Sequence, residues 1–265
     1  MFRVSCIQLC SSENVEHNLN RTKQLIIKAV KQKSHFILTP EVSSKISLNK
    51  KKLLNTATSM DKDFYLNGIR VLAKKYKKWI LIGSLILKVS KSRLVNRSIL
   101  INSSGKIQSV YNKINLFDVN VNSRETHRES HSFIKGNKIV ITKVNGVKIG
   151  LTICYDLRFP NLYRKLAKKN AKVILIPAAF TVPTGKVHWE TLVRARAIEN
   201  SVFIVATNMC GTHHSGRKTY GHSLLFDPWG NKENAGFTKT KILNTEINLD
   251  KIVKVRKKIP SILNT

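Results

Sequence analysis

The chain has 265 residues, of which 42% are hydrophobic and 23% charged, and its formal net charge at pH 7 is +32. This composition is typical of a globular protein and excludes a disordered or coiled-coil chain. No apolar run of about 18 residues occurs, and the start of the chain lacks the basic and apolar segments of a signal peptide. We therefore expect a cytoplasmic protein with no membrane partner.

The large positive charge leaves two interpretations open. A strongly basic protein can bind nucleic acid or another anionic surface. However, the lysines occur singly, in pairs or in short clusters from Lys23 to Lys258, with no interleaved aromatic residues and no zinc-finger pattern. We favour a solvated basic surface and expect no specific nucleic-acid partner.

Hydrophobic periodicity predicts strands and helices that alternate along the chain. In the first part we expect strands at 2–9, 35–38 and 79–87 and helices at 14–33 and 61–77. From there the expected elements are a hairpin (94–102 and 106–112), a polar loop (118–132), strands (138–143, 147–153, 172–176, 202–208, 221–226 and 240–247) and helices (160–169, 185–200 and 249–258).

No linker or repeat separates these elements, so we expect a single domain over residues 1–265. Hairpins are mixed with the alternation of strand and helix. This mixture favours an α/β fold with mixed sheets covered by helices over a purely parallel, doubly wound sheet.

Several common catalytic motifs are missing. The sequence contains no G-x-G-x-x-G and no phosphate-binding P-loop, so nucleotide binding has no support. It also contains no G-x-S-x-G elbow of a serine hydrolase and no H-E-x-x-H zinc motif.

Cysteine is a candidate nucleophile. The four cysteines (Cys6, Cys10, Cys154 and Cys210) are too sparse for a disulfide framework, and reduced thiols are expected. Cys154 follows the expected strand at 147–153 and precedes a helix that Pro160 can open. N–H groups at a helix terminus favour a thiolate, although most free cysteines are simply small buried residues.

Two further residues lie at the ends of expected elements. Glu41 directly follows Pro40 at the end of an apolar strand, and Lys113 follows a hairpin strand. With Cys154 they could form a base, an electrophilic stabiliser and a nucleophile on one scaffold.

A second cluster contains Cys210, His213, His214 and His222. A zinc site is one interpretation, but the cluster has a single thiol and a spacing that zinc sites do not use. We instead favour a loop near the mouth of the active site or a subunit contact, and expect no metal.

Three segments resemble signatures of the nitrilase (carbon–nitrogen hydrolase) superfamily: 39–41, 111–118 and 150–160. Glu41, Lys113 and Cys154 occur in them in the order of the family. Further similar segments cover the rest of the chain: 129–130, 177–181, 188–190, 194–200, 220–223 and 227–230. Residues 158–160, 178–181 and 210–213 are most similar to the Nit-type deaminated glutathione amidase branch.

The resemblance implies a four-layer αββα sandwich whose subunits pair through helices, and hence a homodimer or larger homo-oligomer. It implies an amidase that works through a thioester on Cys154, with Glu41 as general base and Glu129 as a supporting carboxylate. Lys113 and the backbone N–H of Tyr155 would hold the oxyanion. No metal or organic cofactor is needed.

The implied substrate is a small carboxylate-bearing amide, in the first place deaminated glutathione. Asn161 departs from the branch, which often has Glu there, and two alternatives stay open. These are an ω-amidase acting on α-keto acid amides such as α-ketoglutaramate, and an N-carbamoyl amino acid hydrolase. Arg158 could pair with the substrate carboxylate or could order the loop after Cys154. Phe180 and Thr181 would line the pocket.

Overall fold

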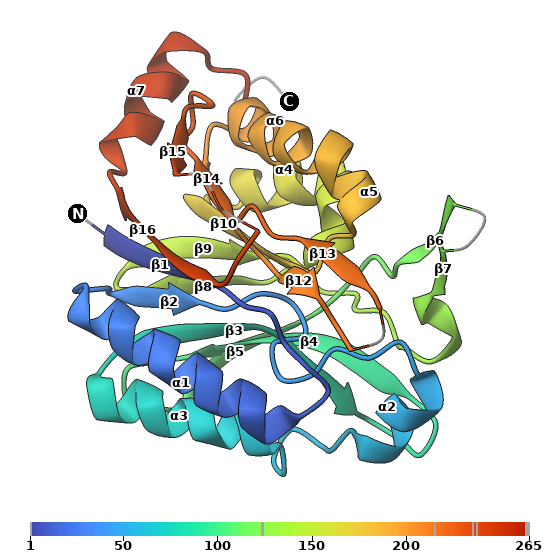
Figure 1. Ribbon diagram of the computed structural model, residues 1–265. Helices are drawn as coiled ribbons and strands as arrows, with labels where there is room; N and C mark the ends of the chain where they lie inside the picture. Colours follow the sequence, from blue (N-terminus) through green and yellow to red (C-terminus); the bar gives the residue numbers. More distant parts are fainter. Residues whose placement is uncertain (1, 123–124, 215, 235, 237, 263–265) are drawn as a thin grey trace.

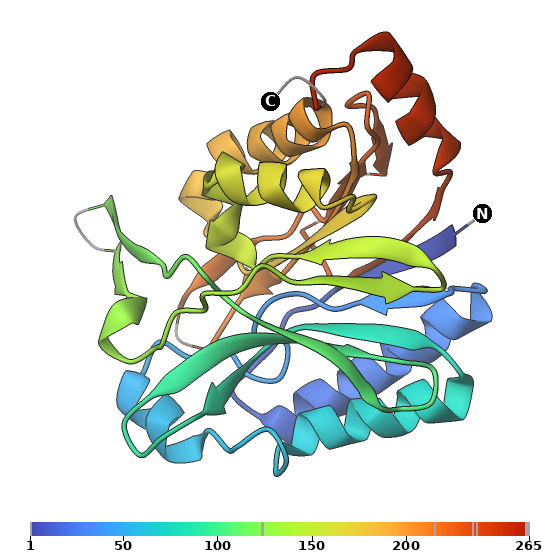
Figure 2. The same ribbon diagram turned by 180° about the vertical axis from the view of Figure 1, so that it is seen from behind.

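The structure is a computed structural model that describes residues 2–122, 125–214, 216–234, 236 and 238–262. Two six-stranded sheets lie face to face with helices on their outer sides (Figures 1 and 2). The first sheet has the order β16 (Lys241–Ile247), β1 (Phe2–Gln8), β2 (Phe36–Leu38), β3 (Trp79–Lys88), β4 (Leu94–Ile101) and β5 (Ile107–Asn112). The second has the order β15 (Lys232–Asn234), β14 (Leu224–Phe226), β11 (Phe203–Asn208), β10 (Val173–Ala178), β9 (Val147–Leu151) and β8 (Ile141–Val144).

Both sheets are mixed. Strands β1, β2 and β3 pair in parallel, while β16 and β4 join them antiparallel. In the second sheet β9, β10 and β11 are parallel, and β8 and β14 flank them antiparallel.

Helices form the two outer layers. Helices α1 (Val15–Lys31) and α3 (Phe64–Tyr76) cover the first sheet, and α4 (Pro160–Lys168) and α6 (Glu190–Asn200) cover the second (Figure 1). The predicted four-layer αββα sandwich with mixed sheets is thereby confirmed. In the described part of the chain, no helix has the length and apolar character needed to span a membrane.

The apolar pattern of the strands follows from the layers. On β3, Leu81 points into the core between the sheets, whereas Ile80 and Ile82 pack under the helices of the first sheet. Successive strand residues face opposite sides, so a strand buried on both sides is apolar throughout.

The expected elements agree with the structure to within a few residues, with some differences. The elements that were not predicted are helix α2 (Lys50–Thr56), the short α5 (Val182–Thr184), the small hairpin of β12 (Cys210–Thr212) and β13 (Lys218–Tyr220), and the edge strand β15. The helix expected at 185–200 begins as a π-helical turn, Gly185–Trp189, before α6. The strand expected at 221–226 is limited to β14.

The polar loop expected at 118–132 is wrong for the described residues. It contains the antiparallel strands β6 (Asp118–Asn122) and β7 (Glu125–Arg128), followed by a 3-10 turn, Glu129–His131. Residues 123–124 lie outside the described part. This hairpin projects from the body of the protein (Figures 1 and 2). The sequence of β6, Asp-Val-Asn-Val-Asn, alternates polar residues with valine, so a period-2 strand signal was present and was missed.

Candidate active site

Glu41 lies just beyond the end of β2 and is buried, with 4% of its surface exposed. One carboxylate oxygen accepts hydrogen bonds from Asn96 Nδ2 at 2.8 Å and Lys113 Nζ at 3.0 Å. The other accepts the backbone N–H of Ala179 at 2.9 Å. The next residue, Val42, has a φ of 51°, which is strained for a β-branched side chain. Three donors therefore fix the position of one carboxylate.

Lys113 lies directly after β5 and is 2% exposed. Its ammonium is 3.0 Å from a carboxylate oxygen of Glu41 and 3.0 Å from one of Glu129. Burial lowers the pKa of Lys113, but the charges of Glu129 and Glu41 outweigh it and raise the pKa above its ordinary value. The side chain therefore stays an ammonium inside the protein.

Cys154 follows β9 and opens a 3-10 turn, Cys154–Arg158, with a φ of 45°. The turn places its thiol at the cavity, next to Glu41. Burial and the charge of Glu41 raise the pKa of the Cys154 thiol well above its ordinary value. Burial also raises the pKa of Glu41, but the charge of Lys113 and the neighbouring Cys154 thiol outweigh it and leave that pKa lowered. The proton thus sits on sulfur, next to an ionised carboxylate.

Glu129 lies on the 3-10 turn after β7 and joins this group. Besides its contact with Lys113, it accepts the backbone N–H of Phe117 at 2.8 Å. The Phe117 ring packs edge-on against Tyr155 with ring centroids 5.1 Å apart. The projecting hairpin is in this way tied to the turn that carries Cys154.

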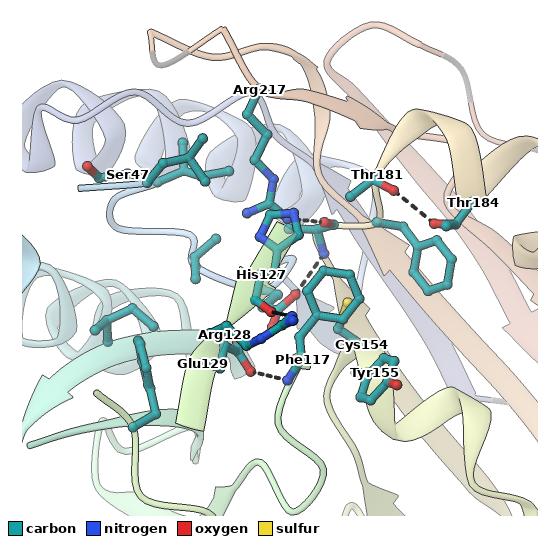
Figure 3. A pocket seen from close by; sticks show the side chains of 18 of the residues that line it. Ser47, Phe117, His127, Arg128, Glu129, Cys154, Tyr155, Thr181, Thr184 and Arg217 are labelled. Carbon is teal, nitrogen blue, oxygen red and sulfur yellow. Dashed lines mark hydrogen bonds between the residues drawn. The ribbon is translucent and has the colours of Figure 1, made fainter. Parts of the chain in front are cut away.

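These groups border a cavity of about 730 Å³ (Figure 3), a volume suited to a small molecule. Among the described lining residues, the acidic ones are Glu41 and Glu129, and both already bind Lys113. The other charged lining residues are basic: Lys45, Arg128, Arg158, Arg217 and Lys218. The electrostatic field of these basic side chains therefore favours an anionic ligand in the cavity.

The predicted substrate residues also line the cavity. The Arg158 guanidinium lies over the rings of Phe180 and Tyr155, 5.5 and 5.9 Å from their centroids, and Nη2 lies 3.2 Å from His188 Nδ1. Phe180 donates its backbone N–H to Asn208 at 2.9 Å. The Thr181 hydroxyl bonds to that of Thr184 at 2.9 Å, as Figure 3 shows.

Sequence reasoning missed Asn96, Ala179, Asp156 and Arg217. Asn96 is a polar residue within the apolar strand β4, and this was the available signal for its role. Asp156, close after Cys154, could have been noticed as a carboxylate in the same motif. Ala179 acts through its backbone, and Arg217 stands in a loop without a pattern, so neither gave a signal.

His213 has a structural position at the end of β12, where the loop of the β12–β13 hairpin begins. Its ring nitrogens lie 2.8 Å from the backbone oxygen of Ser11 and 2.8 Å from the hydroxyl of Thr219. Within the described ranges, no three His, Cys, Asp or Glu side chains gather as metal ligands. The hairpin borders the cavity, because Arg217 and Lys218 line it.

Comparisons with known proteins show what the chain is similar to. The sequence model of the carbon–nitrogen hydrolase family matches residues 3–257. The chain is 35% identical to the deaminated glutathione amidase of Dictyostelium discoideum, over 97% of this chain and 91% of the relative. It is also 35% identical to that of a Synechocystis strain, over 98% and 97%. The NitFhit protein of C. elegans superposes with a TM-score of 0.93 at 32% identity, over 100% of this chain and 65% of that longer one.

Proposed function

Since the chain belongs to the carbon–nitrogen hydrolase family, as the sequence motifs predicted, and is an amidase of the nitrilase superfamily, we propose that it cleaves a small carboxylate-bearing amide through a thioester on Cys154. The observation that carries this proposal is that the Cys154 thiol borders the same cavity as Glu41, whose carboxylate is paired with the Lys113 ammonium at 3.0 Å. These are the nucleophile, base and cation that acyl transfer requires.

In the proposed first half-reaction, Glu41 takes the thiol proton while the sulfur attacks the amide carbonyl carbon. The carbonyl oxygen becomes an oxyanion, which Lys113 and the backbone N–H of Tyr155 would stabilise. Removing one such donor costs about 3–4 kcal/mol in comparable enzymes. The carbon–nitrogen bond then breaks, and Glu41 returns its proton to the leaving amine.

The second half-reaction cleaves the thioester with water. Glu41 is ionised again after losing its proton, so it can deprotonate the attacking water molecule. The tetrahedral intermediate collapses to a carboxylic acid, and the sulfur recovers its proton from Glu41. Glu129 supports both steps by keeping Lys113 charged and in place.

For the substrate we propose deaminated glutathione, the compound named for the relatives in Dictyostelium and Synechocystis. The basic lining of the cavity suits an amide with carboxylates, and Arg158 would bind one of them. Deaminated glutathione and α-ketoglutaramate should be compared side by side by kcat/KM. Preference for α-ketoglutaramate by about 100-fold, or roughly 2.7 kcal/mol in transition-state binding, would assign the protein as an ω-amidase instead.

We further propose that the chain forms one domain, acts in the cytoplasm and assembles into a homodimer or larger homo-oligomer. The four cysteines are unpaired, which suits a reducing compartment. Large apolar side chains on α6 and next to α5, Ile198 and Val187, are exposed at 46% and 68%, which suits pairing through helices. Sedimentation equilibrium and cell fractionation test assembly and location.

A further inference from the structure

Arg217 is held at the cavity by the β12–β13 hairpin. The backbone N–H of His213 donates to the Arg217 carbonyl at 2.8 Å, which closes the loop. Strand β13 in turn lies beside the segment after β10, because Tyr220 donates its N–H to the Phe180 carbonyl at 2.9 Å. Thr219 also forms a bridge with Thr181. The loop is therefore fixed against the segment that carries Ala179, and its arginine is not a free surface group.

The Arg217 guanidinium is only partly used by the protein. Nη2 donates to the Ala179 carbonyl at 2.8 Å. Nε is buried and has no hydrogen-bond acceptor within the described residues. A buried donor without an acceptor is costly, and a carboxylate accepts from a guanidinium in a bidentate fashion. The group therefore has donors to offer a ligand.

Arg217 also points to the reactive centre. In the view of Figure 3 its side chain reaches down from the loop toward the cavity, and Tyr155 lies on the other side of the Cys154 sulfur. The charge of Arg217 contributes to the lowered pKa of Glu41, so its field reaches the base. Among the described residues, three arginines line the cavity. Arg158 lies beside Tyr155 and Arg217 beside Ala179, whereas Arg128 donates to the carbonyls of Val119 and His127 and to Asn120 within its own hairpin.

We propose that Arg217 is a specificity-determining residue that binds a second carboxylate of the substrate, while Arg158 binds the first. This inference rests on the proposed function and narrows it to amides with a carboxylate at each end. Deaminated glutathione belongs to this class, whereas α-ketoglutaramate has a single carboxylate. The competing explanation is that Arg217 only ties its loop to the Ala179 carbonyl.

The two explanations differ in how a loss of activity depends on the substrate. Three amides are compared: deaminated glutathione and its two monomethyl esters, each of which neutralises one carboxylate. Arg217→Met should lower kcat/KM for the dicarboxylate by roughly 10- to 100-fold, mainly through KM. One of the two esters lacks the charged carboxylate that Arg217 would bind. With this ester Arg217→Met should cause little further loss of kcat/KM. With the other ester, Arg158→Met should in the same way cause little further loss of kcat/KM.

Arg70 offers a matched control. Its guanidinium also donates to a backbone carbonyl, that of Gly105 at 3.0 Å, but it lies on α3 and outside the residues that line the cavity. Arg70→Met should leave kcat/KM for all three amides unchanged. Equal loss of activity on all three amides in Arg217→Met would overturn the inference, as would no loss at all. The inference would also be overturned if Arg217→Met and Arg158→Met both showed little further loss of kcat/KM with the same ester.

Binding to a Cys154→Ala protein gives a readout that needs no turnover. Calorimetry should show that this variant binds the dicarboxylate more tightly than either ester, and that adding Arg217→Met removes the preference over one ester. If the wild type cleaves other amides while Cys154→Ala shows no such preference, the inference about Arg217 fails and the proposed function stands. If the wild type cleaves no amide, the proposed function itself fails.

Discussion

Asn115, close after Lys113 in the chain, donates its backbone N–H and its side-chain N–H to Asp156, close after Cys154, at 3.0 and 2.8 Å. The other oxygen of Asp156 accepts the Tyr111 hydroxyl at 2.7 Å and the backbone N–H of Ile153 at 2.9 Å. One buried carboxylate therefore ties the segment around Lys113 to the turn that carries the thiol. Burial raises the pKa of Asp156, which its hydrogen bonds partly oppose.

The first prediction concerns this carboxylate. Asp156→Asn replaces one acceptor by a donor, so at least one of the four hydrogen bonds is lost. We expect the free energy of unfolding to fall by about 1–3 kcal/mol and kcat to fall with little change in KM. Denaturation curves and steady-state kinetics measure both. Tyr111→Phe is the control, because it removes one bond and should cost about 1 kcal/mol. A fully active Asp156→Asn would contradict the positioning role.

Glu129→Gln removes one of the two carboxylates that hold the charge of Lys113. The side-chain amide oxygen of this variant can still accept the backbone N–H of Phe117, so the 3-10 turn should keep its position. We expect kcat to fall by about 10- to 100-fold with KM nearly unchanged, because the oxyanion stabiliser is displaced. Asp118→Asn is the control, since Asp118 is also a carboxylate of this hairpin but binds the backbone N–H of Ser130. Equal kcat values in the two variants would exclude a supporting role for Glu129.

Gly83 on β3 lies where the two sheets approach each other under Glu41. A Cβ atom there would be 2.0 Å from the Thr39 carbonyl oxygen and 2.5 Å from Pro177 Cβ. Gly83→Ala should therefore displace the Glu41 turn, with a loss of about 3 kcal/mol or more in unfolding free energy and a lower kcat. In Gly68→Ala the new atom meets the Leu19 side chain, 2.6 Å from Cδ2, and no backbone atom, so that control should lose less stability than Gly83→Ala. If thermal unfolding showed a larger loss of stability in Gly68→Ala than in Gly83→Ala, this prediction would be wrong.

His213 gives the protein a pH-dependent component of stability. Burial lowers its pKa from the ordinary 6.5, so the folded protein keeps the ring neutral where the unfolded chain binds a proton. This component is fully present above about pH 6.5 and is lost as the pH falls toward the lowered pKa. The difference in unfolding free energy between the wild type and His213→Gln should thus be larger at pH 7.5 than at pH 5.5. Denaturant titrations at both pH values measure it; a constant difference would disprove the assignment.

Much of the fold could be predicted from the sequence. The apolar strands and the amphipathic helices have clear periods, and Glu41 and Cys154 stand directly after predicted strands. The β6–β7 hairpin was missed although β6 alternates polar residues with valine, because β7 (Glu-Thr-His-Arg) has no apolar residue to mark its partner. The contacts of Glu41 with Asn96 and the Ala179 N–H depend on how β4 and the end of β10 meet across two sheets. Such contacts leave no local pattern.

The positions of the candidate site residues were easier to predict than their states. The sequence indicated that Glu41, Lys113 and Cys154 would meet, and they do lie together. It did not indicate that the thiol would keep its proton or that the residues at 42 and 154 would adopt positive φ values. Burial and charge balance decide the first, and the tight turns at the strand ends decide the second. Both arise only once the sheets have packed.

In the proposed mechanism the substrate acyl group forms a covalent bond with the Cys154 sulfur. The measurement is mass spectrometry of the wild-type protein mixed with deaminated glutathione and quenched in acid within the first turnover. We predict an added acyl mass on the peptide that contains Cys154, with neither added mass nor amide hydrolysis in Cys154→Ala. Amide hydrolysis by Cys154→Ala at a rate near that of the wild type, or an acyl group on another residue, would contradict it.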